Sequence, residues 1–295
     1  MKEKVNNLKS NRHKFGMSYR NKTTNRIYHI LMILLSIIMV YPFLWSLFSS
    51  FKPVSELYSG NPLNFIPQNP TIENYERLFE ILPFDRMLLN SIFLSVVIPI
   101  GMIVVSSITA YALARLDFKG KNVIFILFIA VMMVPSHVTT IPNYKTIIDL
   151  NLTNSYWALF LTSVFTATNS FNIFFFRQYF LTIPKDLENA AVIDGCSKFR
   201  VFLQIIMPNS KPAIATTAIL SFRSVWNQFL FPMLVISDYD KLPLTVGLKY
   251  LKEWEPNWAV LLAGSSLSIV PIVIIYLIFQ KYFLQSNLTS GFGGT

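Results

Sequence analysis

The chain has 295 residues, of which 53% are hydrophobic and only 14% are charged. That composition is too apolar for an ordinary soluble domain and predicts a protein embedded in a lipid bilayer. The formal net charge is +10, yet the basic residues form no module with interleaved aromatic side chains of the kind that binds RNA or DNA, so no nucleic-acid partner is expected.

The N-terminal segment, residues 1–26, is rich in Lys, Asn and Arg and has little hydrophobic periodicity, which predicts a mobile cytoplasmic tail. The apolar run after it is too long for a signal peptide, and no small-residue cleavage pattern follows it. We therefore expect this run to be retained as the first membrane helix.

Crossing a hydrocarbon core of roughly 30 Å takes about 20 apolar residues at 1.5 Å each. Six stretches of the chain meet this requirement, which predicts an all-α integral membrane protein with one six-span domain at residues 27–284 and a cytoplasmic tail at 285–295. The spans are predicted at residues 28–51, 88–114, 122–144, 150–176, 212–236 and 256–280.

The orientation of the spans follows from the positions of Lys and Arg, which favour the cytoplasmic side. With the N-terminus inside, the inner segments hold 17 of these residues and the outer loops hold 7. Both termini and the polar segment at residues 184–212 are therefore predicted to be cytoplasmic. On the outer side, residues 52–86 are expected to form a cap with one short helix at 72–82, and residues 237–258 form a second long loop.

The polar segment between the fourth and fifth spans has the signals of two helices joined by a sharp turn. Pro184 suits a helix start, and Gly195 ends the run. Ser197 is placed to cap a second helix, which Pro208 and Pro212 are expected to break. An amphipathic connector lying on the membrane interface is the alternative that this pattern leaves open.

The same segment resembles the EAA loop of ABC importer permeases, because its Ala, Asp-Gly, Ile and Pro residues fall at that loop's spacing. Asn189 stands where the motif has Glu, Glu188 lies one place early, and Met207 replaces Leu. The resemblance marks as ATPase-coupling residues Glu188, Asn189, Ala190, Ala191, Asp194, Gly195, Phe199, Ile205 and Pro208.

Other stretches extend the resemblance to nearly the whole chain. Asn90-Ser91, residues 110–115, residues 226–229 and residues 288–291 look like the carbohydrate-importer branch, and within it the smaller, maltose-type permease. Such a permease is half of a heterodimeric pore in a bacterial-type cell membrane. Its partners are a second permease, two cytoplasmic ATPase subunits that dock on the EAA loop, and an extracytoplasmic solute-binding protein that the loop at 237–258 would face.

The sequence holds no enzyme signature of its own. It has no phosphate-binding Gly-x-x-x-x-Gly-Lys-Ser/Thr loop, its three His residues have no zinc spacing, and Cys196 is its single cysteine. We therefore expect no catalytic, cofactor or metal site in this chain, and ATP hydrolysis in a separate subunit.

Arg223 is the single formal charge inside a predicted span, where a charge costs at least about 2.5 to 3.5 kcal/mol. It either lines the translocation path, with Ser224, Trp226 and Asn227 beside it, or pairs with a polar group elsewhere. For Trp226, packing against neighbouring helices is the alternative to a place in the translocation path.

The function predicted from these features is that of a permease subunit importing an oligosaccharide or monosaccharide. Glycerol phosphate or a polyol is the alternative cargo. A membrane scaffold without transport activity is the alternative of a different class, and it predicts no association with an ATPase.

Overall fold

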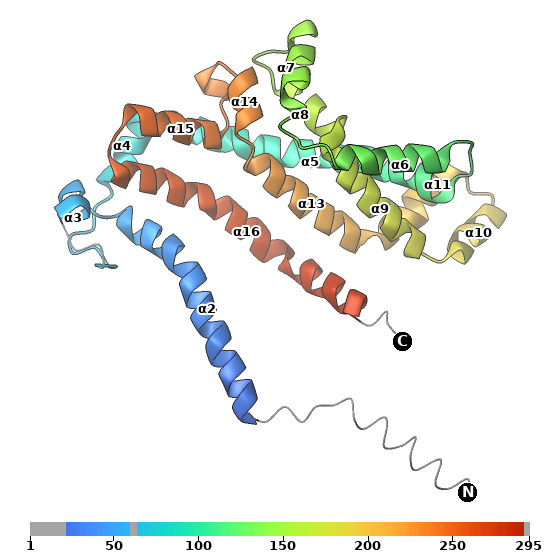
Figure 1. Cartoon of the computed structure of the whole chain (residues 1–295), viewed down its shortest axis with the longest axis horizontal. Helices are drawn as coiled ribbons and strands as arrows, with labels where there is room; N and C mark the ends of the chain where they lie inside the picture. Colours follow the sequence, from blue (N-terminus) through green and yellow to red (C-terminus); the bar gives the residue numbers. More distant parts are fainter. Residues whose placement is uncertain (1–21, 60–63, 292–295) are drawn as a thin grey trace, which may run out of the picture.

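The computed structural model describes residues 22–59 and 64–291, and every regular element among them is helical (Figure 1). Residues 1–21 of the tail predicted at 1–26, and the last four residues of the tail predicted at 285–295, lie outside the described part. Three helices are long, apolar and continuous, each with one internal proline: α2 (Lys22–Ser49), α5 (Phe84–Arg115) and α16 (Trp258–Gly291). These correspond to the first, second and sixth predicted spans.

The other three predicted spans are interrupted. The third consists of α6 (Lys121–Met132) and, after a break, α7 (Thr140–Asp149). The fourth bends by 53° between α8 (Tyr156–Val164) and the pair η1 (Ala167–Asn169) and α9 (Ser170–Thr182). The fifth ends early, as α13 (Lys211–Trp226) followed by the short α14 (Leu230–Val235).

Side chains at the bend of the fourth span donate hydrogen bonds to carbonyls of α8 and of the neighbouring α5. The side-chain amide of Asn169 donates to the carbonyls of Val164 at 3.0 Å and Met102 at 3.2 Å. The Thr166 hydroxyl donates to the Thr162 carbonyl. Without such partners, free carbonyls at membrane depth would each cost several kcal/mol, on the order of the transfer penalty of an unpaired amide.

By length and composition, three described helices can cross a membrane, and the bent pair Tyr156–Val164 plus Ala167–Thr182 makes a fourth. Helix α5 lies at the centre and packs against α9 and α13, and α16 packs on α13. Helix α6 packs mainly on α9. Helix α2 contacts α16 near its C-terminal end, where the hydroxyls of Ser46 and Ser266 lie 3.5 Å apart, and diverges from the bundle over the rest of its length, with nearly all its described side chains exposed (Figure 1).

Shorter helices close the two ends of the molecule. One end holds α3 (Val54–Ser59), α4 (Glu73–Ile81), η3 (Tyr239–Lys241) and α15 (Leu244–Trp254), so the short helix expected near residues 72–82 is confirmed. The opposite end holds α10 (Lys185–Ile193), α11 (Lys198–Val201), the π-helical η2 (Phe202–Ile206) and α12 (Met207–Asn209).

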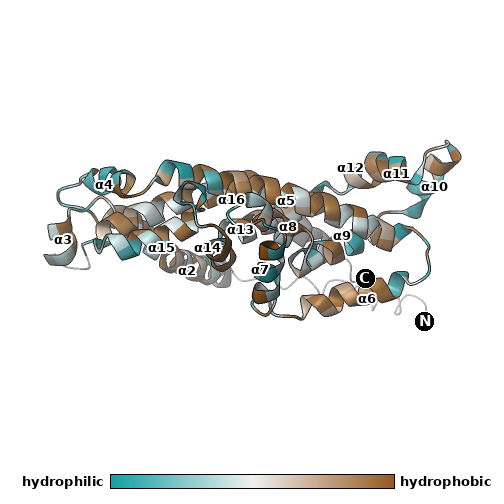
Figure 2. Ribbon diagram, turned by 90° about the horizontal axis from the view of Figure 1, so that it is seen from above, coloured by the Kyte–Doolittle hydropathy of each residue, from teal (hydrophilic) through white to brown (hydrophobic). Residues whose placement is uncertain are grey.

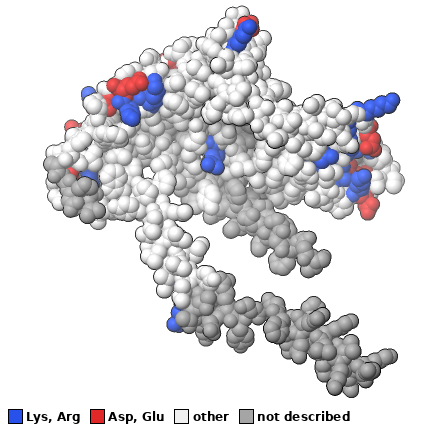
Figure 3. Space-filling view, in the orientation of Figure 1, with Lys and Arg blue, Asp and Glu red and all other residues white. Residues whose placement is uncertain are grey.

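Hydropathy and charge follow this division. Hydrophobic residues run along α5, α6 and α16, and hydrophilic ones gather at α4 and near α10 (Figure 2). Lys, Arg, Asp and Glu gather around α4 and α15 and around α10 and α11, with a further charged group at the tip of α7 and basic atoms in the middle of an otherwise largely uncharged surface (Figure 3). The molecule therefore has the surface expected of a protein whose middle lies in lipid.

Candidate functional site

A sharp turn joins α10 to α11. Gly195 has a φ of 81°, in the left-handed region, and a Cβ built there would meet no atom within 4 Å. The position therefore requires glycine for its backbone conformation and not for lack of space. The Gly195 and Cys196 amides donate to the carbonyls of Val192 at 3.0 Å and Ala191 at 2.9 Å, which closes the end of α10.

The second helix begins as predicted but extends further. The Ser197 hydroxyl accepts a hydrogen bond from the Arg200 amide at 3.3 Å, which confirms the cap. Pro208 does not break the helix, because the π-helical turn of η2 has already shifted the hydrogen-bond ladder before the proline is reached. The helix ends at Ser210, and Pro212 lies in the first turn of α13.

A buried ion pair fixes α10 to the membrane bundle. Arg115 Nε, at the end of α5, lies 2.9 Å from Glu188 Oε1, with side chains only 2% and 9% exposed. The two atoms are not aligned as a hydrogen bond, so the contact is electrostatic. The same guanidinium donates to the carbonyls of Phe180 and Ile183, at the end of α9. Arg115 thus joins α5, α9 and α10 at one point.

A second contact from α5 reaches α11. The Tyr111 hydroxyl donates to the Lys198 carbonyl at 3.2 Å, and its ring packs 5.2 Å from that of Phe202. Sequence reasoning named Tyr111 and Arg115 only within residues 110–115, which resemble the carbohydrate-importer branch, and gave neither a role in this site. The sequence signal that could have identified Arg115 was a basic residue placed directly after an apolar span.

The residues marked as ATPase-coupling divide between two faces. Glu188 and Ala191 are buried against the bundle, and Ile205 is half-buried. The others lie on the surface: Asn189, Ala190, Asp194, Gly195, Phe199 and Pro208. Ile193, which is 86% exposed, and Phe199, which is 62% exposed, are the most accessible large apolar side chains of this end. Together they give it an apolar outer surface suited to a protein partner.

The candidate path residues also divide. Trp226 is 3% exposed and stacks on Phe222 with ring centroids 5.7 Å apart, so it packs in the core. Arg223, Ser224 and Asn227 are exposed on the other face of α13. The Asn227 side chain donates to the Arg223 carbonyl at 2.8 Å, and Arg223 forms no ion pair with any residue in the described ranges.

Comparison with known proteins identifies relatives over most of the chain. Residues 102–287 match the family model "Binding-protein-dependent transport system inner membrane component". The arabinooligosaccharides transport system permease protein AraQ of Halalkalibacterium halodurans is 37% identical over 88% of this chain and 93% of its own length. The trehalose/maltose transport system permease protein MalG of Thermococcus litoralis is 35% identical, with the same coverage of 88% and 93%.

A solved structure shares the fold. A chain from the crystal structure of a bacterial ABC transporter involved in the import of the acidic polysaccharide alginate superposes with a TM-score of 0.75. The match covers 90% of this chain and 99% of that one, at 24% sequence identity. The chain therefore belongs to the family of binding-protein-dependent transport system inner membrane components, as a multi-pass permease subunit of an ABC importer and not its ATPase.

Proposed function

We propose that this permease imports a carbohydrate, that it has six membrane spans, and that it forms one half of the pore. The spans are α2, α5, α6 with α7, α8 with α9, α13 with α14, and α16. The proposal is supported by the relatives at about 35% identity, whose names state arabinooligosaccharides and trehalose or maltose as cargo. A second permease would complete the pore, and the Lys and Arg distribution supports placing both termini and α10 in the cytoplasm.

The end formed by α10 to α12 is proposed to dock on a cytoplasmic ATPase subunit. The observation that carries this is the exposed Ile193 and Phe199 on a helix pair held rigidly to the bundle by Arg115. The pairing of Glu188 with Arg115 turns its carboxylate away from solvent, so we infer that Glu188 does not replace the motif Glu missing at Asn189. The docking surface then carries the neutral amide of Asn189 where the motif would have a carboxylate.

The opposite end is proposed to face the solute-binding protein. It carries α15 and the loop around η3, and the described structure ties these to α4 and α5 by the ion pairs Arg77–Glu255 at 3.3 Å and Arg86–Asp240 at 2.7 Å. These contacts hold the loop at 237–258 against the bundle, so that a partner would meet a preformed surface.

Affinity purification of the membrane complex tests the docking surface. The wild type is expected to copurify an ATPase, a second permease and a binding protein, and Ile193→Asp is expected to lose the ATPase while retaining the second permease. Ile66→Asp is the matched control, because Ile66 is 69% exposed at the opposite end. Wild type without an ATPase in several mild detergents would favour a scaffold, and retention of the ATPase by Ile193→Asp would place the docking surface elsewhere.

Uptake by cells expressing the complex tests the cargo. Labelled maltotriose, arabinotriose and diacetylchitobiose are compared with labelled sn-glycerol 3-phosphate. Import of at least one sugar is expected. Import of glycerol phosphate alone would replace the carbohydrate with the alternative cargo.

A further inference from the structure

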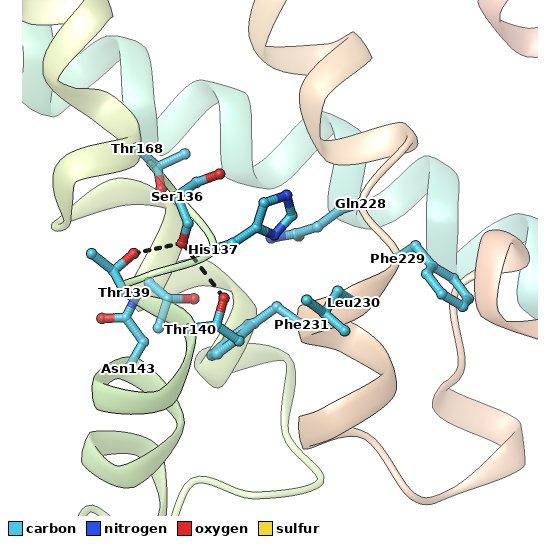
Figure 4. Close-up of a pocket in the computed structure, with 11 residues that line it drawn as sticks. Ser136, His137, Thr139, Thr140, Asn143, Thr168, Gln228, Phe229, Leu230 and Phe231 are labelled. Carbon is cyan, nitrogen blue, oxygen red and sulfur yellow. Dashed lines mark hydrogen bonds between the residues drawn. The ribbon is translucent and has the colours of Figure 1, made fainter. Parts of the chain in front are cut away.

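Three helix interruptions meet around one pocket. It lies where α6 gives way to α7, where α8 gives way to η1, and where α13 gives way to α14, and its volume is about 230 Å³ (Figure 4). Irregular backbone at membrane depth is tolerated only where it is buried in protein or lines a polar cavity. In transporters such broken helices mark the places where substrates are held.

The lining of this pocket is polar but carries no Lys, Arg, Asp or Glu. Ser136, Thr139 and Asn143 come from the break before α7 and from α7 itself, and Gln228 comes from the break before α14 (Figure 4). His137 points from the first group toward Gln228 (Figure 4). Groups from segments far apart in the sequence therefore converge on one space.

The pocket offers both hydrogen-bond acceptors and donors. The Thr139 hydroxyl donates to the Ser136 carbonyl at 2.9 Å, and Thr162 donates to the Ala158 carbonyl at 2.6 Å, which leaves the hydroxyl oxygens as acceptors. The side-chain amides of Asn143 and Gln228 have no hydrogen-bond partner among the residues that the structure describes. They are available to donate to a ligand as well as to accept from it.

We propose that this pocket binds one neutral sugar ring of the transported carbohydrate, an inference that rests on the cargo proposed above. A sugar hydroxyl both donates and accepts, as the lining does. The volume is that of about eight water molecules at roughly 30 Å³ each, which suits a single ring and not a chain. A phosphate or carboxylate would find no cation in the lining to pair with.

A second hollow lies beside the pocket. Its volume is about 400 Å³, and it shares Ser136, Thr139 and Thr168 with the pocket. Further lining comes from the adjacent ends of α6 and α9, at Val131 and Phe171. The pocket therefore adjoins further space between the same helix breaks.

Cysteine protection in the intact importer, reconstituted with its binding protein, tests the inference. Since Cys196 is the sole cysteine, Cys196→Ser gives a cysteine-free background. In that background Asn143→Cys is labelled with a small methanethiosulfonate, with and without the sugar that the wild type imports from the panel above. We expect the sugar to slow labelling at least fivefold. Lys145→Cys, on the same helix but outside the pocket lining, is expected to label at one rate throughout.

Adding Gln228→Leu to Asn143→Cys gives a second readout. Compared with Asn143→Cys alone, the sugar concentration that protects half of the thiol is expected to rise about tenfold, because Gln228→Leu removes two hydrogen-bonding groups, the side-chain carbonyl and amino groups, from the lining. Thr139→Cys takes the place of Asn143→Cys if the latter no longer imports sugar.

The outcomes separate this inference from the cargo proposal. If a sugar is imported but leaves the labelling rate unchanged, or if the pocket thiol is unreactive in the assembled importer, the pocket does not bind sugar and the carbohydrate function stands. If none of the sugars is imported, the cargo proposal fails and the inference fails with it.

Discussion

Arg115 and Glu188 form a pair whose energetics depend on both partners being present. Taking two charges out of water is expensive, and their attraction in a buried site offsets that cost only with good geometry and further hydrogen bonds. Arg115 has those bonds, to the carbonyls of Phe180 and Ile183. The pair therefore fixes the position of α10. Removing either partner leaves the other as an unpaired buried charge.

Glu188→Ala is expected to destabilise the permease by about 3 to 5 kcal/mol, because it leaves the Arg115 guanidinium buried without its carboxylate. Arg115→Ala is expected to cost at least as much, since it also releases the two carbonyls. Thermal unfolding of the purified complex, together with copurification of the ATPase, measures both effects.

Asp117→Ala provides the control at the same end of α5. Asp117 pairs with Lys121 at 3.4 Å, but its side chain is fully exposed, so no measurable change in thermal unfolding is expected. Equal losses for Asp117→Ala and Glu188→Ala would mean that the buried pair has no special role in holding α10.

At the scale of the element, hydropathy predicts where the chain enters the bilayer but not where its helices break. The first, second and sixth spans are continuous helices. The prediction placed the majority of their ends within a few residues. Pro135 marks a position where a span can bend, but the positions of the breaks near Thr166 and Asn227 were not predicted, because one Thr or Asn changes the mean hydropathy of a run of about 20 residues only slightly. What decides the break is whether such a side chain can reach a freed carbonyl, and that depends on the three-dimensional fold.

The turn after α10 was predictable because its determinants are local in the sequence. Gly195 and Ser197 act through local backbone conformation and a bond three residues away, both of which the sequence carries directly. The partner of Glu188 was not predictable in this way, since Arg115 lies on a different span and meets it only through the packing of α5, α9 and α10.

Asn169 tests the account of the bent fourth span. Asn169→Leu removes the donor to the carbonyls of Met102 and Val164 and the acceptor of the Asn172 amide, at 2.9 Å. Buried groups left unpaired cost about 1 to 3 kcal/mol each, so a loss of a few kcal/mol is expected in thermal unfolding. Asn172→Ser, which keeps a hydroxyl near Ser221, is expected to lose less. A stable Asn169→Leu variant would show that the bend is fixed by packing alone.

At the scale of the whole molecule, the charged ends define an orientation that labelling in intact cells can check. Cys196 is expected to react with an impermeant maleimide only after the cells are opened. Ile66→Cys, in the Cys196→Ser background, is expected to react in intact cells. The reverse pattern would invert the proposed topology and place α10 outside, where no ATPase could reach it.

The pairing of Arg115 with Glu188 also sets an order of events during synthesis. The two residues are 73 positions apart in the chain. At about 5 to 20 residues per second, Arg115 is made some 4 to 15 seconds before its carboxylate exists. During that interval the second span holds an unpaired cation at its C-terminal end. A chain interrupted before Glu188 would keep that cation indefinitely, which distinguishes an unfinished subunit from a complete one.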